Sequence, residues 1–185
     1  MKRFLSLFLA LIVAVGICLS APMTIEAEAA TYQVNGVTIP AAGYEVGKAH
    51  GNCWEFAQDI YNKLWPGKGG FSSTRGTSDD MLRNVSTDSA SRAITVENTK
   101  KFISSATLGS VVRVCSMDYM NGGDGWGHSF ILVQKDANGF TAYQGNYAGK
   151  IALTYYTWSS YVSEDKNYNH LGYFKYIKWP GAPAY

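Results

Sequence analysis

Two short segments of the chain contain the residue types needed for thiol chemistry. The first, residues 51–56, reads Gly-Asn-Cys-Trp-Glu-Phe and places Cys53 where a helix is expected to begin. Asn52 can accept a hydrogen bond from the first helical turn, and Glu55 three residues later completes a capping-box pattern. The free N–H groups and the positive dipole end of that turn favour a thiolate. Cys53 is therefore a candidate nucleophile.

The second segment, residues 125–128, reads Gly-Trp-Gly-His and leads into an apolar, strand-like run. An adjacent imidazole can take up or share a thiol proton, which lowers the thiol pKa from its ordinary value of about 8.5. His128 would later give that proton to a leaving amine, and the N–H of Cys53 can help to hold an oxyanion. Because 75 positions separate Cys53 from His128, only the fold can bring them together.

A third side chain should orient the imidazole. The segment Asp136–Gly139 predicts a three-residue hairpin loop, in a register that pairs Phe130 with Asn146. Asn146 is then the diagonal neighbour of His128 on the shared face, and Gln144 lies one pair further along unless a bulge shifts the ladder. A two-residue turn at Asn138-Gly139 would instead place both amides on the opposite face. The spacing therefore predicts Asn146 or Gln144 and does not choose between them.

Hydrophobic spacing predicts the elements that must position these residues. Apolar residues recur at every third and fourth position in residues 53–64, which predicts a helix ended by Pro66-Gly67. A second helix is expected over residues 96–106, with Thr95 as its cap. Further elements are a short helix at 78–84 and strands at 32–40, 111–117, 128–135, 140–147, 151–156 and 171–179. Helices followed by an antiparallel sheet indicate an α+β fold.

The first 30 residues have the pattern of a secretory signal peptide. Two basic residues precede an apolar run over residues 4–19, and Ala27-Glu28-Ala29-Ala30 is typical of a cleavage site. An uncleaved membrane anchor is the alternative. We expect a mature chain of residues 31–185 that forms one domain, leaves the membrane after cleavage, and is secreted or held at the cell wall.

Composition and cysteine count argue against a nucleic-acid partner, a disulfide and a zinc site. A formal charge of +2, with no Lys/Arg block outside the signal, does not support nucleic-acid binding. A disulfide between Cys53 and Cys115 is an alternative, but Cys115 ends an apolar run that suits a buried thiol. A zinc site formed by His50, Cys53 and His128 is a weaker alternative, because no acidic residue lies at metalloprotease spacing. We therefore expect a monomer that needs no metal and no cofactor.

Aromatic residues make up 14% of the chain, and two tryptophans adjoin the two motifs. Trp126 lies in a Gly-rich loop beside His128 and is the stronger candidate for a substrate contact. Trp54 follows Cys53 directly and is the second candidate, with core packing as the alternative. Both rings could stack on a sugar or peptide face.

The order of these motifs resembles the CHAP family of cysteine, histidine-dependent amidohydrolases/peptidases, within the papain-like group that includes other bacterial wall hydrolases. The resemblance covers residues 51–147 and rests on a Cys at a helix start, then Gly-His-Ser-Phe-Ile-Leu-Val, then Tyr-Gln-Gly-Asn-Tyr-Ala-Gly. It implies a papain-like fold with N-terminal helices packed on an antiparallel sheet. It also implies that Cys53 is the nucleophile and His128 the base. Gln144 falls where the family often has Glu, and Asn146 falls on the Asn that follows.

The resemblance further implies a secreted thiol hydrolase that cleaves amide bonds of peptidoglycan through an acyl-enzyme on Cys53. Gln144 departs from the family pattern, since a neutral amide orients His128 but cannot stabilise an imidazolium as a carboxylate does. This departure and the aromatic residues also fit a second class, a non-catalytic cell-wall-binding module on the same fold. A third class is a cysteine peptidase that acts on another amide substrate.

Overall fold

The computed structural model describes residues 30–71 and 78–185, and the predicted signal peptide lies outside them. Its strands are β1 (Tyr32–Val34), β2 (Val37–Ile39), β3 (Val111–Cys115), β4 (Gly127–Lys135), β5 (Gly139–Tyr147), β6 (Lys150–Thr157) and β7 (Tyr173–Lys178). Its helices are α2 (Cys53–Leu64), α3 (Ser89–Arg92), α4 (Val96–Ser105), α5 (Met117–Met120) and α6 (Trp158–Glu164), and α6 continues into the π-helical turn η1 (Asp165–Asn169). None of the helices in the two described ranges is long and apolar enough to cross a membrane.

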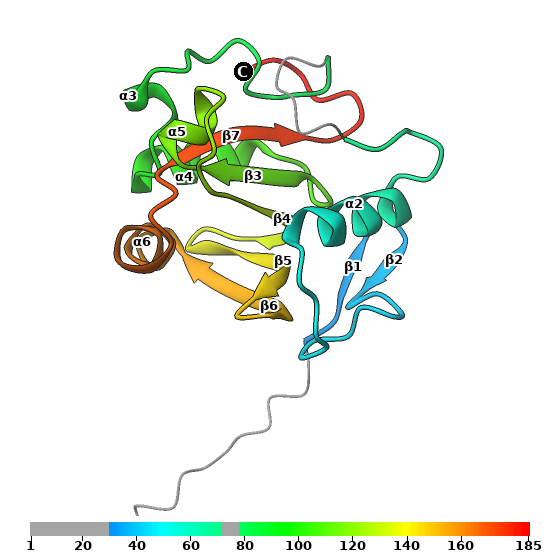
Figure 1. Ribbon diagram of the computed structural model, residues 1–185. Helices are drawn as coiled ribbons and strands as arrows, with labels where there is room; N and C mark the ends of the chain where they lie inside the picture. Colours follow the sequence, from blue (N-terminus) through cyan, green and yellow to red (C-terminus); the bar gives the residue numbers. More distant parts are fainter. Residues whose placement is uncertain (1–29, 72–77) are drawn as a thin grey trace, which may run out of the picture. The chain divides into compact units, whose positions relative to one another are not determined.

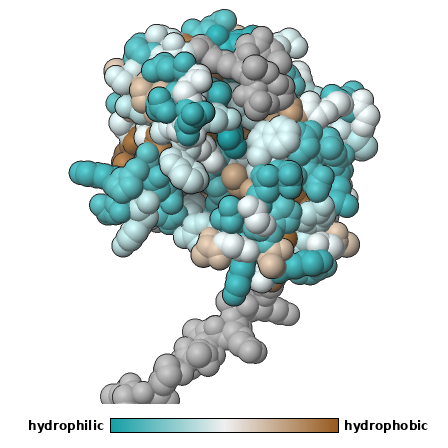
Figure 2. All heavy atoms as spheres, viewed as in Figure 1, coloured by the Kyte–Doolittle hydropathy of each residue, from teal (hydrophilic) through white to brown (hydrophobic). Residues whose placement is uncertain are grey.

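A five-stranded antiparallel sheet in the order β6-β5-β4-β3-β7 forms the centre of the unit of residues 31–185 (Figure 1). Side chains alternate between its two faces, so it has two apolar layers. In strands β3 to β6, odd-numbered residues such as Ile131 and Tyr143 pack with α2 and the β1–β2 hairpin, whereas even-numbered ones such as Phe130 and Phe140 pack with α4 and α6. Polar residues cover most of the face shown in Figure 2, where the apolar areas are small and separate.

The predicted α+β class with an antiparallel sheet is confirmed, but the prediction that all helices precede the sheet is wrong. Along the chain, α5 falls between β3 and β4, and α6 falls between β6 and β7. Each begins at a local cap, since Ser116 Oγ accepts from the N–H of Tyr119 and Thr157 Oγ1 accepts from the N–H of Ser160. Helix α6 contains aromatic residues, which are also typical of strands. Its Trp158 packs in the core.

The predicted short helix at residues 78–84 is also wrong. That segment forms turns, and Asp80 makes an isolated bridge to Lys178 beside β7. The short helix of this region is α3, where Asp88 Oδ1 accepts from the N–H groups of Ala90 and Ser91. A capping aspartate explains why the helix begins there, because it satisfies two donors of the first turn.

Helix α2 confirms the predicted helix over residues 53–64, including its apolar face. Phe56 and Tyr143 meet edge to face with ring centroids 4.8 Å apart, which seats the helix on β5. Gly145 makes this close approach possible. A Cβ added at Gly145 would lie 2.5 Å from Phe56 Cβ, closer than two carbon atoms can pack.

Replacing Gly145 by alanine is therefore expected to push α2 away from the sheet. We expect a loss of about 1–3 kcal/mol in the free energy of unfolding, as for other overpacked sites, measured by urea titration. Gly51→Ala is the matched control, because a Cβ there would meet nothing within 4 Å. Its effect should stay within about 0.5 kcal/mol. Equal stability of the two variants would contradict the packing role of Gly145.

The register of the β4–β5 hairpin differs from the predicted one. Asp136 pairs across the turn with Gly139, not with Phe140, through a hydrogen bond of 3.0 Å from its N–H to the Gly139 carbonyl. A bulge between Leu132 and Gln134 then shifts the pairing by one residue. The two changes together keep even-numbered residues of both strands on one face. Continued by one residue past the pair Ile131–Tyr143, this register brings Gln144 opposite Phe130 rather than opposite Leu132.

Candidate active site

The start of α2 places Cys53 where the cap pattern predicts. Asn52 Oδ1 accepts hydrogen bonds from the N–H groups of Trp54 and Glu55 at 2.9 and 3.1 Å, which fixes the first helical turn. The capping box itself is incomplete, because the N–H of Asn52 donates to His50 Nδ1 and not to the Glu55 carboxylate. Cys53 is half-buried at the first helical position, where free N–H groups and the helix dipole favour a thiolate.

The thiol of Cys53 lies beside the start of β4. Its Sγ is 3.9 Å from the carbonyl oxygen of Gly127, the residue before His128. Burial raises the pKa of Cys53, whereas the hydrogen bond and charge of His128 and the N–H of Ser129 together lower it by more. The net pKa falls from 9.0 to about 7, so a large part of the thiol is ionised at neutral pH.

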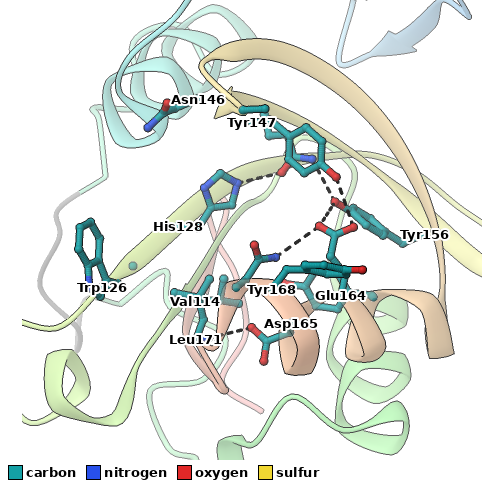
Figure 3. A pocket seen from close by; sticks show the side chains of 15 residues that line it. Val114, Trp126, His128, Asn146, Tyr147, Tyr156, Glu164, Asp165, Tyr168 and Leu171 are labelled. Carbon is teal, nitrogen blue, oxygen red and sulfur yellow. Dashed lines mark hydrogen bonds between the residues drawn. The ribbon is translucent and has the colours of Figure 1, made fainter.

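Gln144, one of the two predicted orienting residues, contacts the imidazole. His128 Nε2 and Gln144 Oε1 are 2.8 Å apart, which leaves Nδ1 as the ring nitrogen available to the thiol. The bulge of the hairpin explains the contact, because it makes Gln144 the diagonal neighbour of His128. Asn146, the other candidate, is exposed with a left-handed φ of 56° and is set apart from the imidazole (Figure 3).

A chain of hydrogen bonds continues from Gln144 into the sheet and α6. Gln144 Nε2 donates to Thr154 Oγ1 at 3.0 Å and to the Tyr156 hydroxyl at 3.3 Å. The Tyr156 hydroxyl donates in turn to Glu164 Oε1 at 2.9 Å (Figure 3). Tyr156 and Glu164 were not predicted from the sequence, because both reach the site only through the pairing of β6 with β5 and the position of α6, which follows β6.

Arg113 is a second residue that the sequence analysis missed. It is buried in β3, where its guanidinium donates to Ser129 Oγ at 2.9 Å and to the Tyr119 hydroxyl at 3.3 Å. Within residues 30–71 and 78–185, no salt bridge joins it to a carboxylate. Its positive charge contributes to the lowered pKa of Cys53. Gly127 leaves room for it, since a Cβ there would lie 2.7 Å from Nη2.

A cavity of about 610 Å³ opens at His128 and extends toward α6 and η1 (Figure 3). Its walls include Trp126, His128, Gln144, Tyr147, Glu164 and Tyr168. Trp126 is 82% exposed and Tyr168 is 79% exposed, so two aromatic rings are open to an incoming molecule. Among the residues that the structure describes, the lining contains two carboxylates, those of Glu164 and Asp165, and neither Lys nor Arg.

The two tryptophans predicted to contact substrate differ in their surroundings. Trp126 lines the cavity and agrees in position with that prediction. Trp54 does not line it, and its ring packs edge to face on Phe71 with centroids 5.8 Å apart. Trp54 therefore has the core-packing role that was the alternative, because its place in the helix turns it toward the apolar layer under α2.

The positions of the cysteines and of His50 bear on the zinc and disulfide alternatives. Among the residues that the structure describes, no three His, Cys, Asp or Glu side chains are grouped so that they could hold a metal ion. The His50 ring packs edge to face on Phe56 at 5.5 Å between centroids. Cys53 and Cys115 are both free thiols, and burial raises the pKa of Cys115 to about 11. The two cysteines thus have opposite reactivity at neutral pH.

Comparison with known proteins yields one distant structural similarity. The crystal structure of Ly7917 is similar to this chain with a TM-score of 0.37 and 20% sequence identity. The similarity covers 81% of this chain and 58% of the other, so this chain spans less than two thirds of that protein. No family model and no curated protein matches the sequence. A structural similarity of this size carries no inference about function.

Proposed function

We propose that this protein is a secreted thiol hydrolase of the CHAP type, with a papain-like fold, that cleaves amide bonds of peptidoglycan. The proposal rests chiefly on one observation, the position of Cys53 at a helix N-terminus beside the start of β4, where Gln144 orients the imidazole of His128. The lowered pKa of Cys53 agrees with this geometry. A thiolate at neutral pH with an adjacent oriented base is the arrangement that nucleophilic catalysis requires. Residues 31–185 act as a single monomeric domain without a cofactor.

The reaction proceeds in two steps through Cys53 and His128. The thiolate attacks the carbonyl carbon of the amide and forms a C–S bond, while the N–H of Cys53 contributes to stabilising the oxyanion. The imidazolium of His128 donates its proton to the leaving amine as the C–N bond breaks. A water molecule then gives a proton to the neutral imidazole and attacks the thioester. This step releases a carboxylic acid and restores the thiolate–imidazolium pair.

A non-catalytic wall-binding module is the second candidate. The neutral residue at Gln144 and the exposed ring of Trp126 favour it. Binding alone, however, gives no physical reason to lower the pKa of Cys53 by about two units at a cavity edge. A cysteine peptidase with another amide substrate shares every feature of the site, so the choice of peptidoglycan rests on the family resemblance.

The cavity favours a neutral or cationic part of the substrate. Its carboxylates would repel an anionic group, and aromatic faces attract cations and apolar rings. Peptide stems that carry a free amino group have this chemistry. We therefore assign the cavity to the part of the substrate next to the cleaved amide, with Trp126 as a contact at its entrance.

Trp126→Ala is accordingly expected to weaken substrate binding and leave the chemical step intact. KM for soluble peptidoglycan fragments should rise about tenfold, which corresponds to ~1.4 kcal/mol, with kcat nearly unchanged. Tyr155→Ala is the matched control, because Tyr155 is a 47% exposed aromatic residue outside the cavity lining. An unchanged KM for Trp126→Ala, or an equal rise in both variants, would remove Trp126 from the substrate site.

Digestion of purified peptidoglycan tests the proposed function itself. The protein should release fragments whose new ends are one amine and one carboxylic acid, and prior treatment with iodoacetamide should stop the release. Mass analysis of the fragments identifies the cleaved bond. A folded, reduced protein that binds peptidoglycan without releasing fragments would instead support the binding module.

A further inference from the structure

The side chain that orients His128 is neutral, yet it connects the imidazole to a carboxylate. Three hydrogen bonds in series lead from His128 to Gln144, from Gln144 to Tyr156 and from Tyr156 to Glu164. We infer that Glu164 is a positioning residue for the Cys53–His128 pair and acts through this relay of Tyr156 and Gln144. The inference rests on the proposed thiol chemistry, but it does not depend on the identity of the substrate.

The direction of every hydrogen bond in the relay follows from Glu164. An ionised carboxylate only accepts hydrogen bonds, so the single proton of the Tyr156 hydroxyl points to Glu164 Oε1 at 2.9 Å. The Tyr156 oxygen can then only accept, and Gln144 must turn its NH₂ group toward it. The Gln144 carbonyl oxygen is thereby turned to His128 Nε2, which must carry the proton.

The resulting tautomer is the one that the chemistry needs. With the proton on Nε2, the neutral imidazole has its lone pair on Nδ1, where it can accept the proton of Cys53. Thr154, the other partner of Gln144 Nε2, does not fix this direction, because a hydroxyl can both donate and accept. Glu164 is thus the member of the network that sets the polarity of the relay, because its carboxylate accepts the hydrogen bond of Tyr156.

Burial increases the effect of such a relay. Gln144 is 2% exposed and Tyr156 is 4% exposed, so water cannot replace the hydrogen bonds between them. Burial, with a smaller contribution from the charge of Glu164, raises the pKa of Tyr156, which keeps its hydroxyl protonated as a donor. When His128 becomes an imidazolium, the aligned donors place the negative charge of Glu164 at the far end of the same chain. This arrangement supplies part of the stabilisation that a carboxylate at position 144 would provide directly.

Two further contacts hold the Glu164 carboxylate in place. The Tyr147 hydroxyl lies 3.4 Å from Oε2 and Asn169 Nδ2 lies 3.3 Å from Oε1. Tyr147 also contacts the Tyr156 hydroxyl, so only the Asn169 contact lies outside the relay and offers a control at the same carboxylate. Asn169→Ala removes one donor from Glu164 and leaves the connection to His128 complete.

The test uses the pH dependence of Cys53 alkylation by iodoacetamide, read from the mass of the peptide that contains Cys53. The midpoint of this profile reports the thiol pKa, about 7 in the unaltered protein. In Glu164→Gln we expect the midpoint to rise by roughly half to one pH unit, because the imidazolium loses its distant countercharge. Tyr156→Phe should shift it in the same direction, and the double variant should shift it no further than Glu164→Gln alone.

Two controls and one rescue separate the relay from a general charge effect. Asn169→Ala and Glu45→Gln should leave the midpoint unchanged, because the first removes a contact outside the relay and the second removes an exposed carboxylate that pairs with Lys48. In a Gln144→Glu background, the Glu164→Gln exchange should no longer move the midpoint, because a carboxylate then contacts His128 directly. An equal shift in both backgrounds would show that Glu164 acts through net charge, and it would overturn the inference.

Turnover measurements distinguish positioning from substrate contact. We expect Glu164→Gln to lower kcat about three- to tenfold, in addition to any rise in KM that follows from removing a carboxylate of the cavity wall. A raised KM with an unchanged kcat and an unmoved alkylation profile would make Glu164 a substrate contact only and would overturn the relay. If Glu164→Gln does not fold, the profile of Tyr156→Phe decides, since that variant loses a single hydroxyl. Alkylation requires no substrate, so a shifted midpoint in a protein that does not cleave peptidoglycan would refute the proposed function alone.

Discussion

Replacing Cys53 by alanine is expected to abolish amide hydrolysis. Cys53 is the thiol that the described residues place beside the start of β4, whereas Cys115 is buried with a pKa of about 11. Loss of a nucleophile typically costs about 10⁴-fold or more in kcat, since the remaining groups only bind and polarise the substrate. The measurement is release of peptidoglycan fragments per molecule of protein, followed by mass analysis over long incubation.

The fold should survive this substitution, because Cys53 is only half-buried and its helix is capped by Asn52. The urea midpoint of Cys53→Ala should therefore lie close to that of the unaltered protein. Cys115→Ala serves as the matched control for loss of a thiol, and it should retain turnover. Undiminished hydrolysis by a folded Cys53→Ala variant would refute the nucleophilic mechanism.

Replacing His128 by alanine is expected to have the second largest effect. Burial alone raises the pKa of Cys53, and the imidazole supplies the main opposing contributions. Without His128 the midpoint of the alkylation profile should rise from about 7 to about 9 or above, so the thiolate is lost below that pH. Turnover should fall by at least about 10³-fold, since the leaving amine also loses its proton donor.

His170→Ala is the control for this substitution. His170 follows η1 with a left-handed φ of 52° and does not line the cavity. Its replacement should leave the alkylation midpoint of Cys53 unchanged. A midpoint that stayed near 7 in His128→Ala would mean that the helix N-terminus and Arg113 suffice to ionise the thiol, and His128 would then not be the base.

The position of Cys53, the proposed nucleophile, could be predicted because its determinants are local. The Asn52 cap and the apolar spacing of residues 53–64 lie within one stretch of sequence, and the structure reproduces both. The strand that carries His128 could also be predicted from local sequence, namely the apolar run that follows His128. For the residue that orients His128, the sequence predicts Gln144 or Asn146 without choosing between them. The choice depends on a bulge near Val133, and no turn residue or proline in the sequence marks that bulge.

The remaining parts of the site depend on pairings between distant segments. Tyr156 reaches Gln144 because Ala152 in β6 pairs with Gln144, and Glu164 follows only when α6 folds back over the sheet. Neither step has a sequence signature of its own. Arg113 could have been found from the sequence, because it is a charged residue in the middle of the apolar run Val111–Cys115. An unpaired charge is costly in such a run. A buried charge in such a run is itself grounds to expect a functional site nearby.

The central claim is that an acyl group is carried by Cys53 during turnover. The most direct measurement is to mix the protein with an excess of soluble peptidoglycan fragments, quench in acid within milliseconds to seconds, and map the mass of every cysteine-containing peptide. The proposed mechanism predicts a thioester on the Cys53 peptide that disappears as product accumulates, and none on Cys115. Product release with no adduct at any quench time, together with full turnover after alkylation of Cys53, would contradict it.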